Sequence, residues 1–145
     1  MRKPVHILLV EDNEGDILLT TEALEESKIT HQLSVVRNGK EALDWVFNQQ
    51  PYQQSGEPDL ILLDVNLPLK SGHEVLQAIK SDDTVKHIPV IMLTTSSSEK
   101  DVNLSYQYAA NCYITKPVEV NDFLDAISTL CHFWVEVVTL PKNKA

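Results

Sequence analysis

Five short apolar runs recur along the chain, and longer stretches with helical spacing separate them. The runs lie at residues 5–10, 32–37, 59–63, 89–94 and 112–115. The first, third and fourth are almost continuously apolar, which is typical of strands buried on both faces of a parallel sheet. The second alternates more between polar and apolar residues, so we expect it nearer a sheet edge. The alternation of runs and amphipathic stretches predicts repeated β-α units and an α/β fold.

The intervening stretches carry helix signals. The clearest is 16–26, where Leu19, Ala23 and Leu24 share one helical face. Asn38–Gly39 predicts the start of a second helix that continues to Phe47. Gly72–Ile79 predicts the third, and Ser97 or Ser98 is expected to cap the fourth.

The fifth helix is expected to begin at Asn121 as its cap and to extend to about residue 140, because Pro141 cannot continue it. The polar segment Asn48–Pro58 contains two prolines and a glycine, which predicts a long surface loop.

Five β-α units joined by short right-handed crossovers can form only a few topologies, of which the flavodoxin-like strand order 2-1-3-4-5 is the most populated. We therefore predict a (βα)5 doubly wound parallel sheet. Residues 1–145 are expected to form a single domain, with a short tail after the fifth helix. In such folds the functional groups gather at the carboxyl ends of the strands.

Composition excludes several classes of protein. A net charge of −9 would repel nucleic-acid phosphates, so we expect no nucleic-acid partner. Cys112 and Cys131 have neither CxxC spacing nor a histidine at ligand spacing, and we expect free thiols. No run approaches the roughly 18 apolar residues that cross a bilayer, and the N-terminus has no signal-peptide pattern. The expected location is cytoplasmic, without a membrane partner.

Chemically active residue types follow four of the predicted strands. Glu11 and Asp12 follow the first, Asp64 the third, Thr94 ends the fourth, and Lys116 follows the fifth. Clustered carboxylates repel one another, and an all-oxygen set of ligands suits Mg2+, or Mn2+ in its place. A hydroxyl and an ammonium beside Asp64 suit an incoming phosphoryl group, whose oxygens carry negative charge.

Each of these residues is ambiguous by itself. A single acid after a strand is more often a turn or cap residue, and a single lysine is more often solvated surface. Their joint occurrence at successive strand ends makes coincidence a poor explanation and favours a phosphoryl-accepting site.

Three segments resemble the response-regulator receiver family over residues 5 to 130: 7–13 (ILLVEDN), 59–68 (DLILLDVNLP) and 70–72 (KSG). The resemblance implies that a sensor histidine kinase phosphorylates Asp64. It also implies that Asp12 binds the metal directly, that Glu11 binds it through water, and that Asn66 contributes its backbone carbonyl.

The same resemblance assigns further roles. Thr94 matches the family's switch hydroxyl, Tyr113 its switch aromatic residue and Lys116 its lysine at the phosphorylation site. A receiver is a signalling protein that catalyses its own phosphotransfer and slow autodephosphorylation. Thr95 departs from the family, which usually has alanine there, and we expect it to narrow access to the site.

The long predicted loop and the C-terminal end together resemble stand-alone regulators of cyanobacterial phytochrome histidine kinases. The end of the fifth helix is apolar nearly all round, which predicts that a second copy covers it in a homodimer. The expected interface residues are Phe133, Val135, Val137 and Val138. Alternatively, the tail folds back over its own domain.

Other functions fit the sequence less well. A phosphatase of the haloacid-dehalogenase type needs an acid where this chain has Asn66, and a Toprim-like nuclease needs one there too. A flavin binder needs a glycine-rich phosphate loop after the first strand, where Glu11–Glu14 would repel phosphate. The open alternative is a pseudo-receiver, an interaction module that is never phosphorylated.

Overall fold

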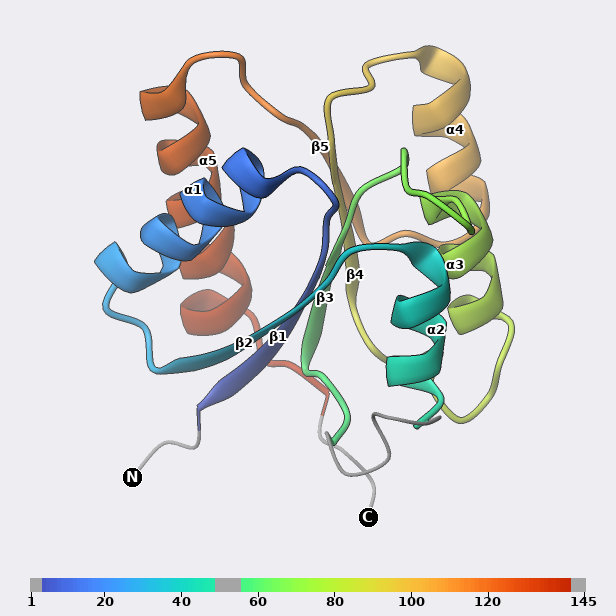
Figure 1. The fold of residues 1–145 in the computed structure, drawn as a ribbon. Helices are drawn as coiled ribbons and strands as arrows, with labels where there is room; N and C mark the ends of the chain where they lie inside the picture. The colour runs from blue at the N-terminus through green and yellow to red at the C-terminus, as the bar shows by residue number, and fades with distance from the viewer. Residues whose placement is uncertain (1–3, 49–55, 142–145) are drawn as a thin grey trace.

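A computed structural model describes residues 4–48 and 56–141. Its sheet has five strands, all paired in parallel, in the order β2-β1-β3-β4-β5 (Figure 1). The predicted fold class and strand order are therefore confirmed, and the second strand lies at an edge as expected. The strand bounds, each within one residue of the prediction, are β1 Val5–Val10, β2 His31–Val36, β3 Leu60–Leu63, β4 Val90–Thr94 and β5 Cys112–Thr115.

Five α-helices cover both faces of the sheet, with α1 and α5 on one side and α2, α3 and α4 on the other (Figure 1). Polar caps define most of their starts, because a side-chain oxygen accepts from a backbone N–H of the first turn that has no partner within the helix. The expected cap Ser98 is confirmed, Asn38 caps α2 at the start that was expected for it, and Asn13 starts α1 two residues earlier than predicted. The bounds are α1 Glu14–Glu26, α2 Gly39–Val46, α3 Gly72–Lys80, α4 Glu99–Gln107 and α5 Val120–Cys131.

Two apolar clusters, one on each face of the sheet, form the core. Residues of β1, β3 and β4 alternate between the clusters, so Leu8 packs toward α2 and α3 while Ile7 packs toward α1 and α5. Full burial of each such side chain contributes about 1.5–3 kcal/mol to folding. The packing of the three central strands thus holds in place the polar residues that follow them in the chain.

The expectation for the fifth helix is wrong at both ends. Glu119, not Asn121, occupies the cap position of α5, and its side chain makes no cap hydrogen bond. The α-helix ends at Cys131, and the wider π-helical segment η1 (His132–Val137) continues it until the backbone becomes extended at Val138. Several β-branched residues near the end disfavour α-helix, and Pro141 restricts the residue before it.

The predicted loop at 48–58 falls largely on residues 49–55, which lie outside the described residues. Asn48 leaves α2 in the left-handed region, with φ of 56°, and residues 56–58 have neither helix nor strand. The predicted tail beyond 141 also lies outside the description. None of the helices in the described ranges combines the length and the apolar character that crossing a membrane demands.

Candidate functional site

The carboxyl ends of the central strands bring buried polar residues together. Glu11 follows β1, Asp64 follows β3, and Lys116 follows β5, and all three side chains are almost fully buried. Thr94 at the end of β4 is completely buried. Charged side chains are rarely buried in proteins unless they are paired, so this edge of the sheet is the candidate functional site.

The Lys116 ammonium is the centre of the cluster. Its Nζ donates to Asp64 Oδ2 at 3.1 Å, to Asp16 Oδ2 at 2.8 Å, and to Glu11 Oε1. Burial lowers the pKa of Lys116, but the hydrogen bonds that it donates to Asp16 and Glu11 and the charges of Asp64 and Glu11 outweigh burial and raise the pKa. The lysine therefore stays positively charged at neutral pH.

Asp16 was missed in the sequence analysis, which considered it only as the start of a helix. Asp16 lies in the first turn of α1, and its carboxylate reaches Lys116 although the two residues are 100 positions apart. No residue pattern in the sequence indicates this contact.

Three acids form a group that could hold a metal ion. One carboxylate oxygen from each of Glu11, Asp12 and Asp64 lies within 4.8 Å of the others. Carboxylate oxygens are the ligands that Mg2+ and Mn2+ prefer, so these residues fit the expected ion. Burial raises the pKa of Glu11 to about 7 although Lys116 acts to lower it, which indicates that a further positive charge would favour the ionised acid.

Asn66 is exposed beside this group, and its backbone N–H donates to Asp64 Oδ1 at 3.2 Å. This contact orients the Asp64 carboxylate. The role of the Asn66 carbonyl as a metal ligand stays a prediction.

Gly72 allows α3 to begin directly against the Asp64 backbone. A Cβ atom at this position would lie 2.0 Å from the Asp64 carbonyl oxygen, and the Gly72 N–H donates to Val65 O at 2.8 Å. No other residue fits without a backbone shift. The close approach fixes the loop that carries Asp64 and Asn66.

Ser96 links the two predicted switch residues. Its N–H donates to Thr94 Oγ1 at 3.3 Å, and its carbonyl accepts from the Tyr113 hydroxyl at 2.7 Å. The Ser96 hydroxyl donates to Asp101 Oδ2 at 2.6 Å, at the start of α4. A change at Thr94 can thus reach both Tyr113 and α4 through one residue, which the sequence analysis missed. Thr95 is exposed beside them.

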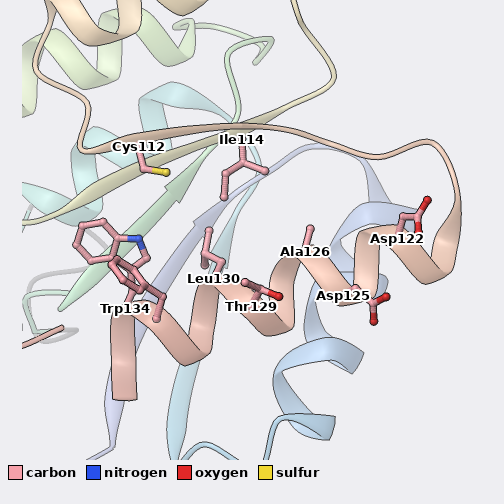
Figure 2. A pocket seen from close by; sticks show the side chains of 9 residues that line it. Cys112, Ile114, Asp122, Asp125, Ala126, Thr129, Leu130 and Trp134 are labelled. Carbon is pink, nitrogen blue, oxygen red and sulfur yellow. The ribbon is translucent and has the colours of Figure 1, made fainter. Parts of the chain in front are cut away.

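A mainly apolar groove of about 480 Å³ lies between β5 and the last helix (Figure 2). Cys112 and Ile114 of β5 face Leu130 and Trp134 across it. Its further lining residues are Asp122, Asp125, Ala126, Thr129 and Phe133.

Of the predicted interface residues, Phe133 lines this groove, and Val135, Val137 and Val138 follow it along the chain. Phe133 is 51% exposed and Val137 60%, whereas Val135 and Val138 are half-buried. Large apolar side chains that are this exposed and lie close together are unusual on a protein surface.

Comparisons with known proteins agree with the geometry of the site. The family model of the response regulator receiver domain matches residues 7–128. Response regulator Rcp1 of Synechocystis sp. is 46% identical over 138 residues, which cover 95% of this chain and 94% of the relative.

Two solved structures are similar to nearly the whole chain. The phosphorylated cyanobacterial phytochrome response regulator RcpA has a TM-score of 0.94 and 44% identity, covering 97% of this chain and 100% of that one. The Mn2+-bound form of Rcp1 has a TM-score of 0.93 and 45% identity, covering 96% and 100%. With the family model and a close relative both spanning most of its length, the chain belongs to the response regulator receiver domain family.

Proposed function

We propose that this chain is a response regulator in which Asp64 accepts a phosphoryl group from a phosphohistidine of a sensor histidine kinase. The observation that carries the proposal is the pairing of the Asp64 carboxylate with the Lys116 ammonium beside two further acids. The phosphorylated state of the similar protein RcpA supports it.

The chemistry follows from the residues. A carboxylate oxygen of Asp64 attacks phosphorus while the P–N bond to the kinase imidazole breaks, and its electron pair stays on that nitrogen. Lys116 donates to the phosphoryl oxygens and offsets their charge. Mg2+ or Mn2+, held by Glu11, Asp12, Asp64 and the Asn66 carbonyl, would supply the remaining positive charge. The chain is thus a signalling protein that assists its own phosphotransfer and slow dephosphorylation.

Labelling with a small phosphodonor tests the site. Wild type should gain acid-stable, base-labile phosphate only with Mg2+ or Mn2+, and EDTA or Asp64→Asn should abolish it. Equal labelling of Asp64→Asn would refute the assignment.

Phosphorylation is proposed to act through Thr94 and Tyr113. New phosphoryl oxygens can attract the Thr94 hydroxyl, which now accepts from Ser96, and the Tyr113–Ser96 contact then loses its fixed geometry. Thr94→Ala should still become phosphorylated but lose most of the NMR shift changes in α4 and β5. Identical shift changes in the variant and wild type would contradict this mechanism.

The proposed kinase partner is of the phytochrome type, which is supported by the names of the similar proteins RcpA and Rcp1. Free Cys112 and Cys131 support a reducing, cytoplasmic location, and a net charge of −9 supports a protein partner over a nucleic acid. A purified phytochrome kinase should transfer phosphate faster than an unrelated histidine kinase. Equal rates would argue against the pairing.

We also propose a homodimer, with the receiver unit extending through η1. Exposed Phe133 lines the apolar groove between β5 and α5, and exposed Val137 follows it four residues later, so a two-fold contact would place the same surface of each copy against the other. Analytical ultracentrifugation should find a dimer that Val137→Asp dissociates. A monomeric wild type at tens of micromolar, phosphorylated or not, would overturn this proposal.

A further inference from the structure

Asp16 is an acid of the site that contacts the Lys116 ammonium and does not belong to the group of acids that could bind a metal. Its Oδ2 lies 2.8 Å from Lys116 Nζ, although the two residues are 100 positions apart. The group whose carboxylates converge as possible metal ligands consists of Glu11, Asp12 and Asp64. The Asp16 side chain is 22% exposed and that of Lys116 is 3% exposed. The contact thus lies at the outer margin of the buried cluster.

The Lys116 ammonium has three N–H donors, and three carboxylates accept from it. A divalent cation would attract Glu11 and Asp64, which belong to the metal group, away from the ammonium. Asp16 would then be the remaining carboxylate partner of Lys116. Phosphoryl oxygens on Asp64 need the same N–H donors.

From this geometry we infer that Asp16 is a positioning residue that holds Lys116 and competes with the phosphoryl group for its ammonium. The inference rests on the proposed function, because it concerns the anion that Asp64 would carry. Asp16 therefore lowers the affinity of the site for an anion while its negative charge favours the cation.

Replacing Asp16 should therefore change the affinities for the cation and for the anion in opposite directions, which the loss of a merely structural residue would not do. In Asp16→Asn, Mg2+ alone should bind more weakly, since one nearby negative charge is gone. At saturating Mg2+, beryllofluoride should bind roughly tenfold more tightly, since a neutral amide oxygen competes less for the Lys116 ammonium than a carboxylate does. A residue that only connects α1 to the segment after β5 would weaken both when replaced.

Matched variants isolate the contact. Glu14→Gln removes one negative charge from the same turn of α1, but Glu14 pairs with Arg37 at 2.7 Å and not with Lys116. Asp16→Glu keeps the charge and can restore the contact. Glu14→Gln should bind Mg2+ and beryllofluoride as wild type does, and Asp16→Glu should recover most of the wild-type affinities for both.

The experiment combines calorimetric titration of Mg2+ with 19F NMR titration of beryllofluoride at saturating Mg2+. At saturating Mg2+, where Asp16 would be the remaining carboxylate partner of Lys116, proton exchange of the Lys116 ammonium should be slow in wild type and faster in Asp16→Asn. Weaker beryllofluoride binding by Asp16→Asn, or affinities equal to those of Glu14→Gln, would overturn the inference. A wild type that binds no beryllofluoride would refute the proposed function itself, and with it the inference.

Discussion

Replacing Lys116 with methionine removes the ammonium that lies between three carboxylates and keeps a side chain of similar length. Glu11 and Asp64 would remain buried with no positive partner in their cluster. Removing one partner of a buried ion pair typically costs about 3–5 kcal/mol of stability, because the other charge stays desolvated.

Proton uptake by Glu11 limits this cost. Burial already raises the pKa of Glu11 to about 7, so Glu11 can take up a proton at pH 7 at little further cost once the ammonium is gone. The loss then falls mainly on Asp64, toward the lower end of that range. We therefore expect Lys116→Met to lose about 3 kcal/mol at pH 7 without metal, which lowers Tm by roughly 10 °C.

Urea unfolding with and without saturating Mg2+ measures the effect. The cation should replace the missing ammonium and reduce the difference to below about 1 kcal/mol. Lys80→Met is the control, because within the described ranges Lys80 donates to the carbonyls of Lys86 and Ile88, at 3.0 and 2.7 Å, and to no carboxylate, so its loss should not respond to Mg2+. A loss in Lys116→Met that Mg2+ leaves unchanged, or no loss at all, would refute the reasoning.

Three further outcomes are expected. Gly72→Ala should cost at least about 2 kcal/mol in urea unfolding, since its Cβ would meet the Asp64 carbonyl oxygen at 2.0 Å, whereas Gly15→Ala, whose Cβ would lie 3.3 Å from the side-chain oxygen of Asn13, should change stability by less than about 1 kcal/mol. Burial lowers the pKa of His6 from its ordinary 6.5, more than Asp59 raises it, so its contribution to stability is present above pH 6.5 and is lost as pH falls; His6→Gln should flatten that part of the stability curve. Burial raises the pKa of Cys131 to about 12, so a thiol reagent at pH 8 should label it only after unfolding.

Features set by local patterns were predictable from the sequence. The apolar runs predicted every strand to within one residue, because central parallel strands must be apolar on both faces. The helix starts at Asn38 and Ser98 could be identified because each of these side chains accepts from a backbone N–H of its own first turn. Glu11, Asp64 and Lys116 could be placed together because the strand order brings strand ends together.

Features that depend on side-chain reach could not be predicted in this way. The pairing of Asp16 with Lys116 requires α1 to lie beside the segment after β5, and the spacing of residues in sequence does not give that distance. Ser96 acts largely through its backbone N–H and carbonyl, which no residue type signals. The change from α- to π-helix after Cys131 could not be predicted either, because π-helical turns are rare and no residue pattern here indicates one.

Direct mapping of the phosphoryl group tests the central claim that Asp64 is the acceptor. Borohydride reduces an aspartyl phosphate to homoserine with loss of phosphate, and peptide mass spectrometry then locates the altered residue. After treatment with a phosphodonor and Mg2+, homoserine should occur at position 64, and it should be missing when EDTA replaces Mg2+. Homoserine at position 12 or 16 in place of 64, or modification of Asp64 that persists without a divalent metal, would contradict the account.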